Sequence, residues 1–194
     1  SLFMYSTDAD FVGAAHGRVL PTAIGVKRTR KDNLVIAYHG DGAAYSIGMS
    51  HTIWSAIRNE NITVIVVNNQ VFGMTGGQMA PTTLEGQKTT SSPLGRDTSK
   101  SGSPLDITKM LSIYDIAYLA RGSVDSPAEI RKTKKYIANG IRNQMEGKGF
   151  SLIEVLSPCP TNWNVSPLDA IEHISSTVKD IFPLGEFVKD GVRL

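Results

Sequence analysis

The sequence predicts an α/β protein built as a three-layer α/β/α sandwich around a mostly parallel sheet. Two short runs, residues 34–38 and 62–67, are apolar along almost their whole length. Such runs are typical of strands whose two faces are both covered. Helical segments alternate with these runs, and this alternation favours right-handed βαβ units in one parallel sheet. At 194 residues the chain is long enough for a real core, so we expect a single domain over 1–194.

The other elements follow from the same periodicity. Residues 43–58 carry Ile47, Ile53, Trp54 and Ile57 at roughly helical spacing. An earlier helix is expected over 14–30, starting near His16. The later elements are expected in this order: a strand at 115–120, a helix over about 127–146, a strand at 150–156 and a helix over about 167–181.

Residues 72–104 depart from this pattern, because they have no sustained period and are rich in Gly, Thr, Ser and Pro. One interpretation is a disordered surface loop. Structureless loops of this length are uncommon inside compact domains, and the others are usually functional lids or binding loops. Both interpretations stay open from the sequence.

Composition excludes several classes of function. The chain is 41% hydrophobic and 20% charged, as in ordinary soluble domains, and its net charge of +2 indicates no nucleic-acid partner. No apolar run approaches the roughly 18–20 residues that cross a bilayer, and no export signal is visible, so no membrane partner is expected. The single cysteine, Cys159, excludes an intrachain disulfide and fits a cytoplasmic location.

Two motifs point to a cation and a phosphate. Gly40-Asp41-Gly42 joins the first apolar run to a helix, and Asn68-Asn69 follows the next run. Both motifs return to the carboxyl edge of the sheet, where open α/β sheets bind ligands. Neighbouring strands lie ~4.8 Å apart, so Asp41 and Asn69 can reach one ion if their strands are neighbours. Mg²⁺ prefers such oxygen ligands, and free N–H groups at a helix start suit a diphosphate. A GDG triplet alone is also an ordinary tight turn.

The order GDG, helical run, apolar strand and NN is a strong pattern for thiamine diphosphate enzymes. The stretch HGDGAAYSIGMSHTIWSAIRNENITVIVVNNQVFGMTGGQMAPTT resembles the β subunit of 2-oxoacid:ferredoxin oxidoreductases, as do AAHGRVLPTAIGVKR before it and SPCPTNW after it. The branch acting on 2-oxoglutarate or branched-chain 2-oxoacids, such as 2-oxoisovalerate, is the most similar. The resemblance continues to FPLGEF near the C-terminus, and it implies the thiamine diphosphate-binding (pyrophosphate-type) fold.

The resemblance implies a set of metal and diphosphate ligands. Asp41 and Asn69 would be the side-chain ligands of Mg²⁺, and the backbone carbonyl of Val71 the third protein ligand. Gly40, Gly42 and Ala43 would surround the diphosphate.

Further cofactor contacts are implied around this centre. Gly73, Met74 and Thr75 would lie against the thiazolium and the diphosphate. His16, Gly17 and Arg18 match the family's HGR segment, and we expect them at the cofactor edge because a helix start suits an anion. Ile47 and Met49 are either cofactor contacts or core residues.

The implied reaction is oxidative decarboxylation of a 2-oxoacid to an acyl-CoA, with coenzyme A as acceptor and ferredoxin taking the electrons. The cofactor supplies the electron sink, and the protein supplies position and electrostatics. In similar enzymes the activating glutamate lies on the partner subunit, and Glu60, Glu85 and Glu154 match no such motif. We therefore assign no catalytic residue here and expect a hetero-oligomer with an α subunit, with γ and δ subunits as further candidates.

Three departures from the family limit what carries over. Met74 replaces an Asn of pyruvate-specific relatives, which favours a larger or less polar substrate pocket. Gly76 replaces a Lys of many two-subunit relatives, which leaves the substrate carboxylate without an assigned contact. Cys159 matches one of four ligands of a [4Fe–4S] cluster, and the third would fall just before Ser1.

One cysteine cannot hold a cluster that needs four thiolates. Either a segment ahead of Ser1 supplies the other cysteines, or the chain has no cluster and Cys159 is a small buried side chain.

Other functions remain as alternatives. A non-redox thiamine diphosphate decarboxylase or carboligase shares the GDG and NN elements, but normally carries its activating glutamate on the same long chain. A non-catalytic assembly subunit could keep the fold without the cofactor. A dinucleotide-binding protein would need G-x-G-x-x-G, and GDGAAY lacks the third glycine.

Overall fold

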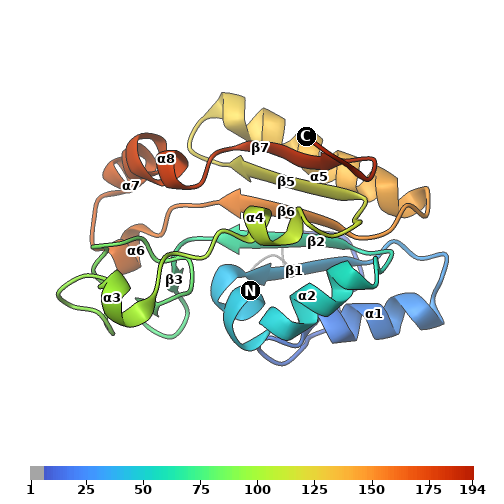
Figure 1. Cartoon of the computed structure of the whole chain (residues 1–194), viewed down its shortest axis with the longest axis horizontal. Helices are drawn as coiled ribbons and strands as arrows, with labels where there is room; N and C mark the ends of the chain where they lie inside the picture. Colours follow the sequence, from blue (N-terminus) through green and yellow to red (C-terminus); the bar gives the residue numbers. More distant parts are fainter. Residues whose placement is uncertain (1–6) are drawn as a thin grey trace.

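In the computed structural model, which describes residues 7–194, a six-stranded sheet lies between layers of helices (Figure 1). Ser1, ahead of which the resemblance expects a further cysteine, lies outside that range. The strand order is β1-β2-β6-β5-β7-β8; the first four strands pair in parallel, and β7 and β8 are antiparallel. The predicted mostly parallel α/β class is confirmed. The strands are β1 Ile36–Gly40, β2 Thr63–Asn68, β5 Tyr118–Ser123, β6 Ser151–Leu156, β7 Gly185–Lys189 and β8 Val192–Arg193.

Alternate residues of the four parallel strands face opposite layers, because successive side chains of a strand point to opposite sides. On one side, which we call the α2 face, the sheet packs against α1 (Val19–Thr29), α2 (Met49–Ile57) and α4 (Ile107–Leu111). On the other side, the α5 face, it packs against α5 (Pro127–Met145). Ser126 caps α5 by accepting the N–H of Glu129, and Pro127 occupies the first turn.

Several element boundaries differ from expectation. The helix expected over 14–30 begins only at Val19, since Gly17 has a φ of +72°. The helix expected over 43–58 starts with a π-helical turn, η2 (Ala43–Ile47), before α2. The strand expected at 115–120 lies about three residues later, and the β7–β8 hairpin was not expected. The expected final helix divides into α7 Pro167–His173, η3 Ile174–Val178 and α8 Lys179–Ile181.

The apolar spacing of residues 43–58 indicated a helix correctly but did not indicate its buried face. Ile47, Trp54 and Ile57 are exposed by 52%, 55% and 45%. The buried face of α2 consists of the small residues Thr52, Ser55 and Ala56. Small side chains let this helix approach the sheet closely, so the large apolar residues are left on the outside.

The long segment 72–104 is ordered around one arginine. Its start forms a hairpin of β3 (Val71–Phe72) and β4 (Gln78–Met79), and α3 (Thr98–Ser101) lies near its end. The guanidinium of Arg96 is almost wholly buried. It donates hydrogen bonds to the backbone carbonyls of Ala80, Pro81, Thr83, Ser101, Gly102 and Ser103. The segment is therefore ordered, which argues against the interpretation as a disordered surface loop.

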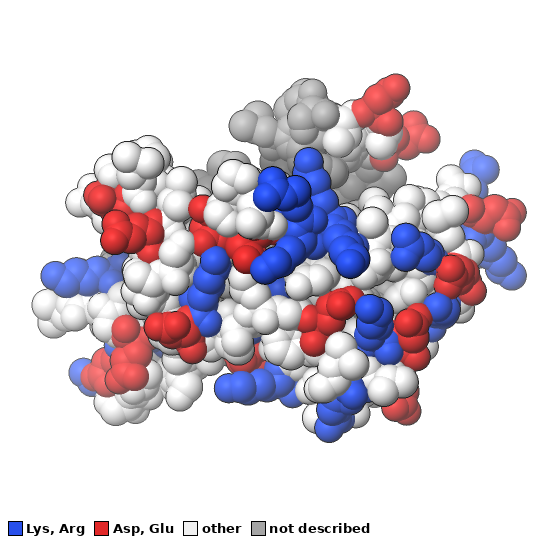
Figure 2. All heavy atoms as spheres, turned by 90° about the horizontal axis from the view of Figure 1, so that it is seen from above, with Lys and Arg blue, Asp and Glu red and all other residues white. Residues whose placement is uncertain are grey.

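The outer surface carries mixed charge. Seen from above, acidic and basic side chains are interspersed, with one group of Lys and Arg near the middle of the view (Figure 2). This mixture agrees with the small net charge of the sequence. Within residues 7–194, no helix combines the length and the apolar character needed to cross a bilayer.

Candidate functional site

Two turns meet at the carboxyl edge of the sheet. β1 and β2 are parallel neighbours, with Gly40 opposite Val67 in the register. Asp41 follows β1 directly and opens the helical run that leads into η2. Asn69 follows β2 and precedes the β3–β4 hairpin. The two motifs therefore lie side by side, as the sequence predicts for neighbouring strands.

Three oxygen atoms converge between these turns. The side-chain oxygen of Asn69 lies 3.3 Å from Oδ1 of Asp41 and 2.8 Å from the carbonyl oxygen of Val71. With the amide turned over, its nitrogen would donate to both oxygens. In the orientation shown, the N–H of Val71 donates to the amide oxygen over a long 3.4 Å. A cation between the three acceptors removes this conflict without turning the amide.

The donor set fits a hard cation. A carboxylate, an amide oxygen and a backbone carbonyl are ligand types of Mg²⁺, which leaves further positions for water and phosphate oxygens. Elsewhere in residues 7–194, no group of three or more His, Cys, Asp or Glu side chains is placed to hold a metal. The residues at the sheet edge therefore fit the Mg²⁺ ion that the sequence suggests.

Asp41 is held in an unusual environment for a carboxylate. Its side chain is only 1% exposed, and the Thr82 hydroxyl donates a hydrogen bond to its Oδ2. Burial raises the pKa of Asp41 to about 7, and the Thr82 hydroxyl and the Gly42 N–H oppose that rise. A cation on Oδ1 would stabilise the charged form of this carboxyl group.

The helix start beside Asp41 is shaped by close packing. Gly42 has an ordinary helical φ of −59°, but a Cβ there would lie 2.5 Å from a ring carbon of Phe72. A Cβ on Gly40 would meet nothing nearer than the Val67 carbonyl at 3.9 Å. Gly42 is thus needed for Phe72, while Gly40 borders open space. The N–H groups of the first turn, including that of Ala43, lack partners four residues earlier within the helix and are the groups that suit an anion.

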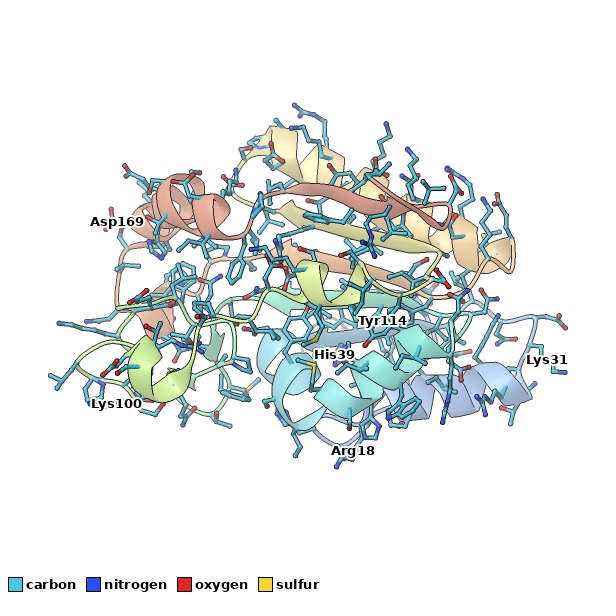
Figure 3. All side chains as sticks on the ribbon, in the orientation of Figure 1. Arg18, Lys31, His39, Lys100, Tyr114 and Asp169 are labelled. Carbon is cyan, nitrogen blue, oxygen red and sulfur yellow. The ribbon has the colours of Figure 1, made fainter. Side chains whose placement is uncertain are left out.

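The HGR segment packs on the end of the π-helical turn. A Cβ on Gly17 would lie 2.3 Å from the side chain of Ile47. Arg18, labelled in Figure 3, donates to the Ile47 carbonyl at 3.1 Å, and its side chain stays exposed. The ring of His16 lies 6.0 Å from that of Phe72. Met49 is half-buried against the core, so of the two possibilities for this residue the structure favours the core.

The turn after β2 is fixed by the side chain of Asn68. Its Oδ1 accepts the N–H of Gln70 at 3.2 Å, and its Nδ2 donates to Glu154 at 3.0 Å. Gln70 takes the left-handed conformation, with φ of +58°, and its carbonyl accepts from the Thr83 hydroxyl. This Asx turn brings the Asn69 amide and the Val71 carbonyl to the same side.

Three buried polar residues lie in one row across the α2 face, next to the carboxyl ends of the strands. The row runs across four neighbouring strands in the order His39, Val66, Glu154 and Arg121, and Val66 is its one apolar member. Glu154 and Arg121 form an ion pair with both side chains fully buried, and Arg121 also binds Asp106 at 2.6 Å.

The titration behaviour of this row follows from burial and charge. Burial opposes the charge on Arg121, but Glu154 and Asp106 outweigh it and raise the pKa of the guanidinium. Burial, helped by the charge of His16, lowers the pKa of His39 to about 4, so this imidazole is neutral near pH 7. Within residues 7–194, neither ring nitrogen of His39 has a hydrogen-bond partner.

The SPCPTNW segment supports the turn of residues 68–71, which we call the metal turn because the sequence predicts metal ligands there. It forms α6 (Pro160–Trp163), and the indole N–H of Trp163 donates to the Asn69 carbonyl at 3.0 Å. The Asn162 amide donates to the Gly73 carbonyl at 3.2 Å and to the Cys159 sulfur at 3.1 Å. Cys159 thus lies beside Gly73 of the β3–β4 hairpin, and its sulfur is a free thiol.

The residues expected over the thiazolium lie at an open surface. Gly73 is half-buried, and Met74 and Thr75 are exposed, Met74 by 91%. Thr75 hydrogen-bonds Gln78 across the hairpin. The residues that fit a metal ion are thus buried, whereas the residues expected over the thiazolium are largely exposed.

Sequence reasoning missed three residues that hold Asp41 and Asn69 in place. Thr82 contacts Asp41, Trp163 contacts Asn69, and Arg96 fixes the segment around Thr82. No local sequence pattern joins these residues to the two motifs. Asn68 was visible in the sequence as the first Asn of the NN pair. A buried Asn needs a hydrogen-bond partner, so its contact with a carboxylate could have been sought.

The fold, the GDG turn and the convergent oxygens together define a class. The chain matches the family "Thiamine pyrophosphate enzyme, C-terminal TPP binding domain" over residues 4–155, and it belongs to that family. The resemblance to 2-oxoacid:ferredoxin oxidoreductases is also confirmed. The chain is 40% identical over 184 residues to the ketoisovalerate oxidoreductase subunit VorA of Methanothermobacter thermautotrophicus, covering 94% of this chain and 39% of that protein.

Two further relatives agree. The 2-oxoglutarate synthase subunit KorB of Archaeoglobus fulgidus is 37% identical over 172 residues, covering 89% of this chain and 60% of that protein. The 2-oxoglutarate:ferredoxin oxidoreductase of Magnetococcus marinus, solved with 2-oxoglutarate, coenzyme A and succinyl-CoA, superposes with a TM-score of 0.70 at 26% identity. It covers 91% of this chain and 64% of that one. The chain thus spans less than two thirds of the length of each of these relatives, and 39% of the first.

Proposed function

We propose that this chain is the part of a 2-oxoacid:ferredoxin oxidoreductase that binds thiamine diphosphate through Mg²⁺. The observation that carries the proposal is the convergence of Asp41 Oδ1, the Asn69 amide oxygen and the Val71 carbonyl beside a helix start. The family membership supports the cofactor, and the names of the relatives support the reaction class.

Different residues would bind different parts of the cofactor. Asp41, Asn69 and the Val71 carbonyl would hold the cation, whose charge would neutralise the diphosphate. Gly40, Gly42 and Ala43 would surround the diphosphate: Gly40 borders open space and the N–H of Ala43 would donate to a phosphate oxygen, while the N–H of Gly42 donates to Asp41. The exposed guanidinium of Arg18, with Gly17 and His16 beside it, adds positive charge at the cofactor edge.

When bound, thiamine diphosphate supplies the electron sink for loss of CO₂ from a 2-oxoacid. The chain's own residues position it. Gly73, Met74 and Thr75 offer the surface against which the reactive ring lies, with Ile47 as a second exposed apolar contact. Met74 favours a larger or less polar substrate pocket, and the names of the relatives support 2-oxoglutarate or a branched-chain 2-oxoacid such as 2-oxoisovalerate as substrate, with coenzyme A as acyl acceptor.

The missing side of the site supports a partner subunit. The three glutamates considered from the sequence are engaged elsewhere: Glu60 pairs with Arg28, Glu154 pairs with Arg121, and Glu85 accepts from Thr98. We therefore place the activating glutamate on an α subunit, with γ and δ subunits as further members of the complex. Met74 and Ile47, both expected to contact the cofactor, are exposed by 91% and 52%, and a partner surface would cover them and exclude water from the reaction.

Cys159 does not by itself fit an iron–sulfur cluster. It is the one cysteine of the sequence, and a [4Fe–4S] cluster takes four protein ligands. No step of the reaction is therefore assigned to a cluster in this chain. Ferredoxin remains the proposed electron acceptor of the complex. Low-potential electron transfer and the free thiol of Cys159 both suit a reducing cytoplasm, where we place the enzyme.

The proposal is tested by calorimetric titration of thiamine diphosphate into the protein purified with its partner subunits, with and without Mg²⁺. We expect Mg²⁺-dependent binding. Asp41→Ala should lower the affinity by about 30-fold or more, because loss of one partner of a buried charged contact costs roughly 2–5 kcal/mol. Asp115→Ala, which removes an exposed carboxylate before β5, should leave it unchanged. Unchanged affinity in folded Asp41→Ala protein would refute the metal site.

Activity separates the alternatives. With a 2-oxoacid, coenzyme A and a low-potential electron acceptor, the complete complex should turn over and the isolated chain should not. Decarboxylation that needs neither coenzyme A nor the acceptor would indicate a non-redox decarboxylase. Absence of cofactor binding in the complete complex would indicate an assembly subunit.

A further inference from the structure

The two oxygens of Asp41 are treated differently by the protein. Oδ1 faces the Asn69 amide, which in turn lies 2.8 Å from the Val71 carbonyl oxygen. Oδ2 accepts a hydrogen bond from the hydroxyl of Thr82, which is completely buried. Oδ1 therefore lies on the side of the proposed cation, and Oδ2 is held by Thr82; the backbone N–H groups of Gly42 and Asn69 also donate to this carboxylate.

Thr82 is not free to move away from Asp41. The guanidinium of Arg96 binds the carbonyls on both sides of it, those of Pro81 at 2.9 Å and Thr83 at 2.7 Å, and also that of Ala80 at 3.3 Å. The hydroxyl of Thr83 binds the Gln70 carbonyl, so the same segment is tied to the metal turn. The ordered loop thus holds the Thr82 hydroxyl at a fixed place over Oδ2.

This arrangement matters for the choice of cation. Mg²⁺ takes six oxygens at about 2.0–2.1 Å in strict octahedral geometry, whereas Ca²⁺ takes about six to eight at 2.3–2.6 Å and accepts bidentate carboxylates. A carboxylate oxygen that accepts a hydroxyl hydrogen has one lone pair fewer for a cation, so Asp41 binds a cation more readily through its other oxygen alone. Binding through one oxygen suits Mg²⁺ and disfavours the bidentate contact that Ca²⁺ could use.

We propose that Thr82 is a specificity-determining residue of the cation site: by holding Oδ2, it keeps Asp41 monodentate and favours Mg²⁺ over Ca²⁺. Thr82 acts through Asp41 and is a positioning residue, and Arg96 fixes Thr82 in turn. The inference rests on the proposed Mg²⁺-dependent binding of thiamine diphosphate.

The test compares two cations on the same protein. Thiamine diphosphate binding to the protein purified with its partner subunits is measured by calorimetry at increasing Mg²⁺ and, separately, at increasing Ca²⁺. The readout is the ratio of the half-saturating Ca²⁺ concentration to the half-saturating Mg²⁺ concentration. Because the ratio compares two cations in one protein, a general loss of stability does not move it.

Three variants isolate the hydroxyl. Thr82→Val keeps the shape and removes the donor, and it should lower the ratio about tenfold, the size of one hydrogen bond to a charged group. Thr82→Ser keeps the donor and should retain the wild-type ratio. Thr133→Val is the matched control, because Thr133 is also buried and donates its hydroxyl to one carbonyl, that of Ser123, on the α5 face. It should retain the wild-type ratio as well.

The outcomes are distinguishable. A wild-type ratio in Thr82→Val, or an equal fall in Thr82→Ser, would overturn the role of Thr82 while leaving the cofactor site in place. If Thr82→Val does not fold, Thr82→Ala is judged by the same ratio. Wild-type protein that binds thiamine diphosphate without any divalent cation would instead overturn the proposed function, and this inference with it.

Discussion

The two faces of the sheet are built from the same strands but carry different chemistry. On the α5 face the core consists of Ile65, Tyr118, Ala120, Ile153 and Val155, and the buried polar residues there, such as Thr63, are uncharged. On the α2 face, apolar rows end at the carboxyl edge in the row that contains His39, Glu154 and Arg121. Buried charge is therefore concentrated beneath the metal turn.

This difference bears on what the charges are for. A buried ion pair is weak evidence for stability, since well-packed apolar residues often serve equally well. Here Glu154 holds Asn68, and Asn68 shapes the turn that presents Asn69 and Val71. We infer that the buried charges at the edge of the α2 face fix the metal turn, although apolar residues there could pack equally well. The α5 face contributes to stability alone.

The largest expected effect comes from neighbouring residues of β6 that point to opposite faces. Glu154→Ala should destabilise the protein by roughly 3–5 kcal/mol, because it leaves Arg121 buried with only part of its compensation. Ile153→Val on the α5 face should cost about 0.5–1.5 kcal/mol. Denaturant unfolding measures both. Glu154→Ala should also weaken Mg²⁺ binding, and Ile153→Val should not.

If the two variants lose the same stability, or both leave Mg²⁺ binding intact, the two faces do not differ as inferred. Glu154→Gln refines the test, because it keeps an acceptor for Asn68 and removes the charge. Mg²⁺ affinity nearer to wild type in Glu154→Gln than in Glu154→Ala would show that the hydrogen bond to Asn68 carries the effect.

The sequence was a good guide to one part of this comparison and a poor guide to the other. Residues 34–38 and 62–67 are apolar runs, so the existence of two strands could be read from them, although β1 lies about two residues later than expected. The GDG and NN turns could be placed at one edge because parallel strands end together. Both inferences use only local pattern and elementary topology.

What could not be predicted depends on contacts between distant segments. Arg121 and Glu154 are 33 residues apart, and Thr82 and Asp41 are 41 apart, so no periodicity joins them. The buried face of α2 was also hidden, because its small residues Thr52, Ser55 and Ala56 carry little hydrophobic signal. Tertiary packing, which decided these points, is not encoded in a local window.

A smaller effect is expected from adding one methyl group on each face. A Cβ on Gly42 would lie 2.5 Å from Phe72, and one on Gly140 of α5 would lie 2.7 Å from the Ile153 side chain. Overpacking costs roughly 1–3 kcal/mol, which Gly140→Ala partly recovers through up to about 1 kcal/mol of helix propensity. Gly42→Ala should also reduce thiamine diphosphate affinity, whereas Gly140→Ala should lower the melting temperature only. Equal losses of affinity in the two variants would contradict the division between the faces.

The smallest expected effect concerns the brace at the carboxyl edge, and the two tryptophans of the chain provide matched variants. Trp163→Phe keeps an aromatic ring among the residues around Leu84 and Leu156 but removes the N–H that binds the Asn69 carbonyl at 3.0 Å. One such hydrogen bond is worth roughly 0.5–1.5 kcal/mol, so Mg²⁺ affinity should fall about two- to tenfold. Trp54→Phe changes an exposed ring that stacks near Arg58, and it should leave the affinity unchanged.

Fluorescence reports the same contrast, because each variant leaves a single indole. In Trp54→Phe the remaining Trp163 lies against the metal turn, so its emission should respond to Mg²⁺ with thiamine diphosphate. In Trp163→Phe the remaining Trp54 should give little response. A strong response from Trp54 alone would mean that binding alters the outer surface of α2, and the brace at Asn69 would then not be the element that senses the metal.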